Sequence, residues 1–359
     1  ISIYVNPLVY IAFLILLPME IAGALLLVLG SLLPLAGYRL AKAVLGEAAA
    51  SSEVPASSAL PAPGGSLPGT DTGSPETAAF TGDAEVFLIE DQSTGEVQQV
   101  PRRDYLIGAV AAEMPLSWPD EALKAQAVAA HSYVLYCRDH ATAANGAWLS
   151  ADPARRQGYL TDAVLHSYWG TRYDANYIRL SALVDSVLTQ VLCYEGAPAG
   201  TSYFAISNGR TEASENVWGA SLPYLVAVDS STDLQADHYE VTLTLSSAQV
   251  QAALAAQGLT PDAAAPEEWF SSPTRTASGY VARLSVCGVE RSGAFLRRAL
   301  GLRSTDFTIR YESGQFYITT HGYGHGVGLS QWGAKAFAEQ GLSYDAILAH
   351  YFPGTTLCG

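Results

Sequence analysis

The chain has 359 residues, of which 49% are hydrophobic and 15% charged, with 34 acidic against 19 basic side chains and a formal net charge of -15. This apolar content excludes a wholly disordered protein, and four cysteines are too few for a disulfide-dense miniprotein. The acidic balance, without any basic run, also excludes a general nucleic-acid binder, because backbone phosphates repel such a surface.

Residues 1–42 are predicted to anchor the chain in a membrane. Residues 8–36 are apolar almost without interruption, and no Lys or Arg precedes Arg39. A spanning helix needs roughly 20 apolar residues, so this stretch predicts one single-pass helix. A cleaved signal peptide is the less favoured alternative, because the stretch exceeds a normal signal h-region. Arg39 and Lys42 follow the helix, which by the positive-inside tendency favours a cytoplasmic body.

Residues 43–84 are predicted to be a disordered tether. They are mainly Ala, Ser, Pro, Gly and Thr with scattered acids and offer little to bury. A flexible coil of this length has a root-mean-square reach of roughly 35 Å, which lets the body work at a distance from its anchor.

Residues 85–359 are predicted to form a single α+β domain in which short strands and helices are interleaved around a substrate groove. Two strands flank a turn at Ser93 to Gly95, and helices are expected at 104–113 and 120–137. Further strands are expected at 189–195, 224–230, 307–313 and 315–320, and further helices at 246–258, 292–301 and 333–341.

The helix at 120–137 has two distinct faces. Its apolar stripe consists of Leu123, Ala127, Ala130, Val134 and Cys137, which recur every three or four residues. Lys124 and His131 lie seven residues apart on another face, where they are expected to face a common groove.

Three motifs stand out in the body. They are AAEMPLSWPDEALKAQAVAAHSY at 111–133, SNGRTE at 207–212 and the glycine-dense HGYGHGVGLSQWGAKAFAEQG at 321–341. With a fourth stretch, LRRALGLRSTDF at 296–307, they resemble the stage II sporulation protein D family, whose wider relatives include amidase enhancers. The resemblance covers residues 105–357.

The resemblance implies a membrane-anchored lytic transglycosylase that degrades peptidoglycan during engulfment of the forespore. Its substrate would be glycan strands stripped of their stem peptides, and its domain would lie outside the cytoplasm, between the mother-cell and forespore membranes. The implied partners are stage II sporulation proteins P and M. A non-catalytic peptidoglycan-binding or amidase-enhancing module is the alternative, and a metallohydrolase is a third hypothesis.

Glu113 is the predicted catalytic residue. It is the one acid in the apolar stretch IGAVAAEMP, so burial is expected to raise its pKa into the range of a general acid. A lytic transglycosylase can use one carboxyl group as acid and then as base, because the 6-hydroxyl of the sugar attacks, and this chemistry requires no cofactor. The family match at Glu-Met-Pro favours this role over a solvent-exposed acid at a helix end.

The predicted substrate contacts come from the groove helix and the two later motifs. Lys124 matches a family groove position, with a solvated helix face as the alternative. Arg210 is expected to pair with the lactyl carboxylate of muramic acid. In the glycine-dense loop, a bare backbone lets a polymer approach closely. The full set is Lys124, Ser207, Arg210, Thr211, His325, Gln331 and Tyr351, and core packing is the alternative for Tyr351.

A structural zinc is the one cofactor considered. Some family members bind zinc through His and Cys in this region, and the candidates here are His131, Cys137 and His140. On a straight helix His131 points away from Cys137, so all three converge only if the helix unwinds. The alternative is a buried Cys beside two surface histidines. His321 and His325 do not form a zinc-protease motif, because glycines break the helix it requires.

Overall fold

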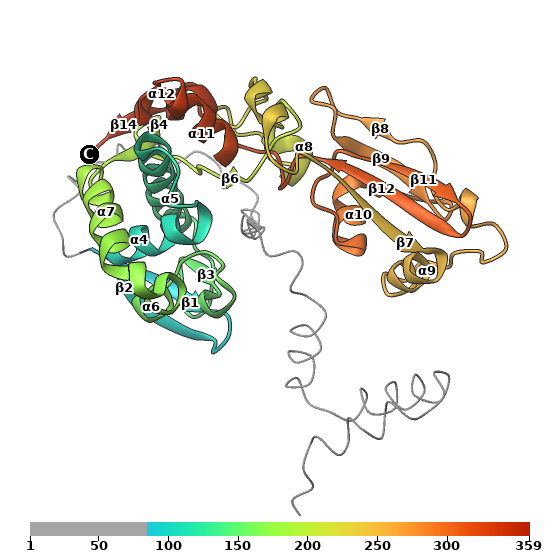
Figure 1. Cartoon of the computed structure of the whole chain (residues 1–359), viewed down its shortest axis with the longest axis horizontal. Helices are drawn as coiled ribbons and strands as arrows, with labels where there is room; N and C mark the ends of the chain where they lie inside the picture. The colour runs from blue at the N-terminus through green and yellow to red at the C-terminus, as the bar shows by residue number, and fades with distance from the viewer. Residues whose placement is uncertain (1–84) are drawn as a thin grey trace, which may run out of the picture. The chain divides into compact units, whose positions relative to one another are not determined.

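The computed structural model of the chain describes residues 85–359 (Figure 1). This part mixes helices and strands, as the α+β prediction required. The predicted anchor at 1–42 and tether at 43–84 lie outside the described residues. Between residues 85 and 359, no helix is both long and apolar enough to cross a bilayer.

The described chain begins with the predicted hairpin. Strand β1 (Val86–Asp91) pairs antiparallel with β2 (Glu96–Pro101), and β3 (Leu149–Ala151) adds parallel to β1. The turn is fixed by the Asp91 carboxylate, which accepts hydrogen bonds from the Ser93 amide at 2.8 Å and the Ser93 hydroxyl at 2.6 Å. Local turn chemistry therefore sets this register.

A helical layer packs on this hairpin. It consists of α4 (Arg102–Glu113), α5 (Asp120–Asp139), α6 (Asp162–Trp169) and α7 (Tyr173–Ser186). Helix α5 is the centre of the first hydrophobic core, because α4, α7, α11 (Gln331–Glu339) and α12 (Tyr344–Tyr351) all contact it. Four of the five residues of its predicted stripe are buried and the fifth, Cys137, is half-buried, yet burial extends around almost the whole helix from Ala122 to Tyr136. An Ala-rich helix permits this, since small side chains let neighbouring helices approach from several sides.

The C-terminal segment returns to the first core. Helices α11 (Gln331–Glu339) and α12 (Tyr344–Tyr351) pack on α5, and β14 (Thr356–Cys358) pairs antiparallel with β4 (Val191–Tyr194). Strand β5 (Ala197–Pro198) completes that sheet, and Cys193 forms a disulfide with Cys358. Strands β6 (Tyr203–Phe204) and β13 (Leu329–Ser330) pair in parallel, and α8 (Ser214–Trp218) follows β6 in the chain.

A second hydrophobic core is formed by side chains from Val250 to Ile318. In the sequence these residues lie between the two stretches of chain that form the first core. The sheets of the second core have the orders β11-β12-β7 and β10-β9-β8. The elements are β7 (Glu240–Ser246), α9 (Ser247–Ala255), β8 (Thr274–Arg275), β9 (Val281–Val286), β10 (Val289–Ser292), α10 (Gly293–Leu300), β11 (Phe307–Glu312) and β12 (Gln315–His321). Short 3-10 turns occur at Pro153–Arg155, Gly170–Arg172, Ser231–Gln235 and Pro266–Glu268.

One predicted strand is wrong. Residues 224–230 are irregular, and their pairing is limited to an isolated bridge between Arg210 and Asp229. The segment has an apolar run but no neighbouring strand to complete a ladder. The other predicted elements are confirmed to within a few residues, including the second-core helices, which begin at the N-cap residues Ser246 and Ser292.

Candidate functional site

Glu113 is the last residue of α4. The helix ends there because Met114 is extended, with φ of -129° and ψ of 140°, as expected for a residue that precedes proline. The side chain is 5% exposed, and the apolar residues of α4 and α5 surround it. The end of α4 thus places a single carboxyl group at the edge of the first core.

The hydrogen bonds of Glu113 come from a neutral amide. Gln331 donates from Nε2 to Glu113 Oε2 at 3.0 Å and to Gln126 Oε1 at 3.4 Å. Burial raises the pKa of Glu113 to about 7, and the Gln331 hydrogen bond opposes part of this rise. At neutral pH the carboxyl group is therefore divided between its protonated and ionised forms.

Two consecutive features of the chain position Gln331. Strand β13 pairs with β6 just before it, and Ser330 caps α11 by accepting a hydrogen bond from the Gly333 amide at 3.2 Å. Gln331 is fully buried at the first position of the helix. The sequence singled out both Glu113 and Gln331, and the structure brings them into direct contact although they lie 218 residues apart.

Asp233 is a buried acid that the sequence analysis missed. Its Oδ2 accepts hydrogen bonds from the Ser207 amide at 2.6 Å, the Ser330 hydroxyl at 2.6 Å and the Ser230 hydroxyl at 3.2 Å. Burial raises its pKa to about 6, and these hydrogen bonds oppose the rise. Asp233 therefore ties the SNGRTE motif to the N-cap of α11, one residue before Gln331.

The SNGRTE residues divide between buried and exposed positions. The Ser207 side chain is buried and accepts a hydrogen bond from the Gly209 amide at 3.0 Å. The Thr211 hydroxyl donates to Val226 O at 3.1 Å and accepts from the Val228 amide at 2.8 Å. Arg210 is exposed, and its closest hydrogen bond, to Ala227 O, is 3.5 Å long. The two hydroxyls shape the loop, whereas Arg210 remains accessible to solvent.

His325 and Tyr351 have their polar atoms engaged by the protein. His325 Nδ1 accepts from the Val327 amide at 3.1 Å, so Nε2 carries the hydrogen that is donated to Tyr203 O at 3.1 Å. Burial and the nearby Arg297 lower the pKa of His325 to about 3, so the ring is neutral. Tyr351 is fully buried, with its hydroxyl 2.8 Å from Ser230 Oγ, as the core-packing interpretation requires.

The two groove candidates on α5 do not share a surface. Lys124 is half-buried at the first turn, where it forms an ion pair with Glu121 at 2.8 Å. His131 is fully buried and packs against Phe87, with ring centroids 6.0 Å apart. The expectation that both face one groove is therefore wrong. The two residues lie two turns apart on one helix, but the Ala-rich helix is also buried around His131.

The three predicted zinc ligands do not fit a metal site. His131 Nδ1 lies 3.0 Å from Gln190 O, and its Nε2 is buried without a hydrogen-bond partner. His140 stacks on Tyr136, with ring centroids 4.1 Å apart. Helix α5 stays regular through Cys137, so the unwinding that convergence requires does not occur. In the part of the chain that the structure describes, no three His, Cys, Asp or Glu side chains form a metal-binding group, and the zinc prediction lacks support.

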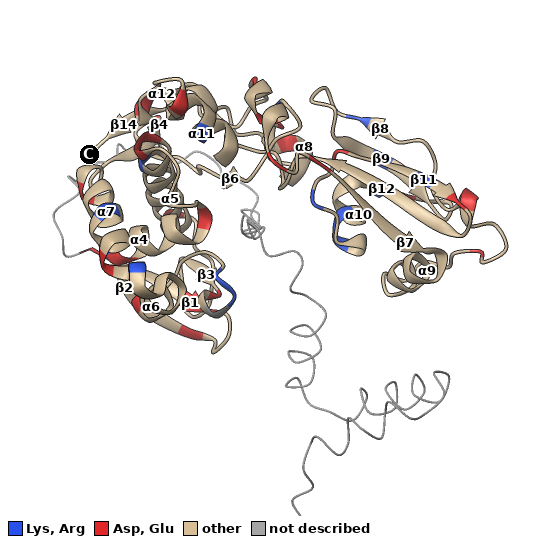
Figure 2. Ribbon diagram, in the orientation of Figure 1, with Lys and Arg blue, Asp and Glu red and all other residues tan. Residues whose placement is uncertain are grey.

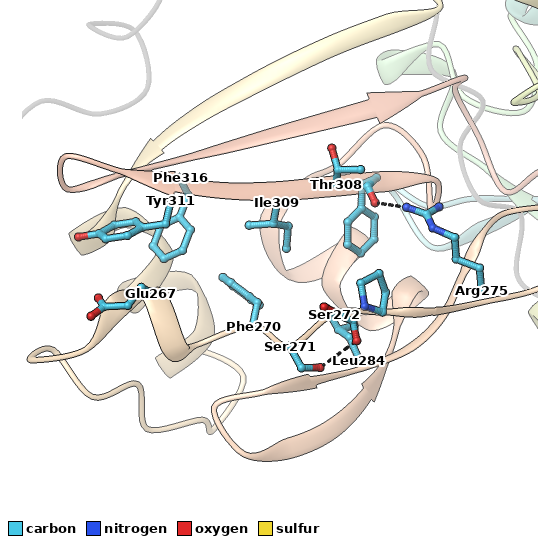
Figure 3. Close-up of a pocket in the computed structure, with 12 residues that line it drawn as sticks. Glu267, Phe270, Ser271, Ser272, Arg275, Leu284, Thr308, Ile309, Tyr311 and Phe316 are labelled. Atoms are coloured by element: carbon cyan, nitrogen blue, oxygen red, sulfur yellow. Dashed lines mark hydrogen bonds between the residues drawn. The ribbon is translucent and has the colours of Figure 1, made fainter.

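A pocket of the second core contains none of the predicted site residues. It has a volume of about 360 Å³ and lies between β11 and the segment that leads into β8 (Figure 3). Phe270 and Ile309 point toward each other across it, and Arg275 closes one end by donating to Phe307 O at 2.8 Å. Its lining combines apolar side chains with polar ones such as Glu267, Ser272 and Thr308, and Glu113 is not part of it.

Comparison with known proteins relates the chain to sporulation proteins. A family described as "SpoIID: Stage II sporulation protein" matches residues 90–194. The chain is 36% identical over 267 residues to stage II sporulation protein D of Bacillus amyloliquefaciens, which covers 74% of this chain and 76% of that protein. It is 34% identical over 274 residues to the protein of the same name in Bacillus subtilis strain 168, covering 76% and 78%.

The comparison also found a relative with a different name. The chain is 30% identical over 310 residues to the amidase enhancer of Bacillus subtilis strain 168, covering 70% of this chain and 40% of that protein.

Proposed function

The chain belongs to the stage II sporulation protein D family, and on this premise we propose that it is a lytic transglycosylase acting on peptidoglycan glycan strands stripped of their stem peptides. The observation that supports this most directly is the state of Glu113. It is a buried carboxyl group with a pKa of about 7 and one hydrogen bond from a neutral amide. Such a group can both donate and accept a proton at neutral pH.

The proposed reaction uses Glu113 twice. In the first step its carboxyl proton moves to the glycosidic oxygen, and the bond from that oxygen to C1 of the muramyl residue breaks. In the second step the ionised Glu113 takes the proton of the muramyl 6-hydroxyl while that oxygen bonds to C1. The product is a 1,6-anhydromuramyl end, no water is consumed, and Glu113 returns to its protonated form.

The residues around Glu113 suit this cycle. Burial keeps the acid protonated for the first step, and the Gln331 amide stabilises the carboxylate that forms afterwards. Trp118 and Trp332 meet edge to face with ring centroids 6.0 Å apart, and Trp332 directly follows Gln331 in α11. We assign the partly exposed Trp332 ring as a face on which a sugar can stack.

The proposal includes location and partners. A membrane anchor at 1–42 and a tether at 43–84 would hold residues 85–359 outside the cytoplasm, between the mother-cell and forespore membranes. The disulfide between Cys193 and Cys358 supports an oxidising compartment. Stage II sporulation proteins P and M are the proposed partners, with engulfment during endospore formation as the process.

A second candidate function is favoured by the amidase-enhancer relative. In that case the body binds peptidoglycan and stimulates an amidase without cleaving glycan itself. Glu113 would then be a structural acid whose burial serves the fold.

Digestion of purified peptide-free glycan strands separates the two functions. We expect wild type to release 1,6-anhydromuramyl ends, detected by mass spectrometry as fragments lighter by one water than hydrolysis products. Glu113→Gln should slow release by about 10²–10⁴-fold, whereas Glu339→Gln, an exposed acid on α11, should not. If wild type yields no anhydro ends but accelerates an amidase on intact peptidoglycan, the non-catalytic function holds instead.

A further inference from the structure

Four arginines around α10 have no acidic partner. Arg291, Arg297, Arg298 and Arg303 form no ion pair with any carboxylate in residues 85–359, although most other Lys and Arg side chains of this region do. Figure 2 shows Lys and Arg but no Asp or Glu on α10. In a chain with a net charge of -15, such a local excess of positive charge is a candidate anion site.

Arg297 is a partly buried arginine of this group. Its Nε donates to Leu302 O at 3.3 Å, and burial lowers its pKa, with the neighbouring Arg298 adding to the effect. Burying a guanidinium group without a counter-ion is unfavourable, because the lost hydration is not replaced. An anion bound beside Arg297 would restore that lost interaction.

Arg297 lines a cavity of about 100 Å³ together with Glu212, Thr276 and His325. The Glu212 carboxylate in this cavity already accepts hydrogen bonds from neighbouring residues. Glu212 Oε1 accepts from the Ala213 amide and from Asn216 Nδ2, both at 2.8 Å, and Oε2 accepts from the Thr276 hydroxyl at 2.5 Å. Glu212 therefore organises the cavity wall and leaves Arg297 available to an external anion.

One segment of chain contributes both to the cavity and to the hydrogen bond of Glu113. His325 lines the cavity, and Gln331, six residues later, donates to Glu113. Arg303 contacts the same segment. Its carbonyl accepts a hydrogen bond from the Gly324 amide at 3.0 Å, and its guanidinium group lies 4.3 Å from the centroid of the Tyr323 ring. The glycine-dense loop therefore connects the wall of the cavity to the residue that donates to Glu113.

We infer that Arg297, supported by Arg303, binds the lactyl carboxylate of a muramyl residue and so selects strands without stem peptides. This inference rests on the proposed function. A stem peptide is joined to the lactyl group through an amide, which removes the negative charge. A guanidinium group pairs with a carboxylate through two parallel, charge-assisted hydrogen bonds that a neutral amide cannot make. The preference for peptide-free strands would then follow from this pair.

The test measures binding without cleavage. In a Glu113→Gln background, affinity is measured for peptide-free glycan oligomers and for the same oligomers with their carboxylates converted to methylamides. We expect amidation to weaken binding at least tenfold, roughly the effect of losing one charge-assisted pair. Arg297→Gln should weaken binding of the carboxylate oligomers to a similar extent and should leave binding of the amidated ones unchanged.

Arg310→Gln is the matched control. Arg310 lies on β11 in the second core, is exposed and is ion-paired to Glu312, so its loss should not affect either oligomer. The inference is overturned if the Glu113→Gln protein with Arg297 intact binds amidated and carboxylate oligomers equally, a comparison that needs no change at Arg297. It is also overturned if Arg297→Gln weakens binding to vesicles of anionic phospholipid and not to glycan.

The outcome is distinguishable from failure of the proposed function. Cleavage is judged by anhydro ends from wild type, whereas carboxylate binding is judged in the Glu113→Gln protein. Carboxylate-dependent binding without any anhydro ends would support the anion site and reject the transglycosylase. Anhydro ends released equally from peptide-free and amidated strands would support the transglycosylase and reject the anion site.

Discussion

The pKa of Glu113 lies near neutral pH, so this one carboxyl group can act first as an acid and then as a base. Burial raises this pKa from 4.5 to about 7, and the first step requires the protonated form. The rate should therefore fall as the pH rises through about 7, by about tenfold per pH unit well above it. Release of anhydro ends from peptide-free strands between about pH 5 and pH 9 measures this limb. A cleavage rate that already falls near the ordinary pKa of a carboxylic acid would contradict the assignment.

Gln331 tunes this pKa through one hydrogen bond. Its Nε2 donates to Glu113 at 3.0 Å and favours the ionised form, so its loss should raise the pKa further. We expect Gln331→Leu to move the falling limb of the pH profile upward by up to about one unit. Gln340→Leu, at an exposed position after α11, is the control and should leave the profile in place. If the pH at which the cleavage rate falls is unchanged or lower in Gln331→Leu, Gln331 does not act on Glu113.

At the scale of elements, Asp233 joins three segments through one oxygen. It accepts from Ser207, Ser230 and Ser330, and Ser330 is the N-cap of α11. Asp233→Ala should lower the free energy of unfolding by about 2–4 kcal/mol, because it leaves several buried donors without an acceptor. Asp233→Asn should cost less, since its amide oxygen can still accept. Urea denaturation measures both, with the exposed Asp237→Ala as control.

The pH dependence of that stability has a defined sign. Burial raises the folded-state pKa of Asp233 from 3.8 to about 6, so folding favours its protonated form. This contribution is fully present below pH 3.8 and is lost as the pH rises through about 6. Asp233→Asn cannot titrate, so the wild type should lose stability relative to it over this interval. A wild type that instead gains relative stability would reverse the interpretation of the network.

Sequence patterns predicted those helices and strands that are determined by residues within the segment itself. The β1–β2 hairpin and the helices α4, α5, α9 and α10 follow from turn residues, prolines, caps and apolar periodicity within each segment. The strand expected at 224–230 failed because a strand also needs a partner, and pairing is decided by distant chain. Glu113 was found because one acid in an apolar run is a local signal.

The contacts of the candidate site were not predictable in the same way. Asp233 lies in a polar stretch that resembles an exposed loop, and its partners Ser207 and Ser330 lie 26 and 97 residues away. The cation near the glycine-dense loop is also a tertiary feature. The sequence predicts Arg210 as the carboxylate partner, and only the folded chain shows that Arg297 lines a cavity with His325.

At the scale of the whole molecule, the chain completes its first core only at its end. Residues 240–321 carry the second core, and beyond them in the chain α11, α12 and β14 pack on α5 and β4. Gln331 belongs to this returning segment, so the candidate site depends on the packing of the C-terminal part. The disulfide between Cys193 and Cys358 fixes that closure by joining β4 to β14 across 165 residues.

Reduction of this disulfide should therefore loosen the C-terminal return. Closing so long a loop restricts the unfolded chain, and we expect Cys358→Ser, or reduction of the wild type, to lower the free energy of unfolding by about 2–4 kcal/mol. Urea denaturation with and without a thiol reductant measures the effect, and Cys287→Ser, at a free cysteine in the second core, should retain full sensitivity to the reductant. Because Gln331 lies in the returning segment, reduction should also weaken its contact with Glu113 and move the pH limb of cleavage upward. Equal stability of oxidised and reduced wild type would show that strand pairing and packing hold β14 in place without the covalent link.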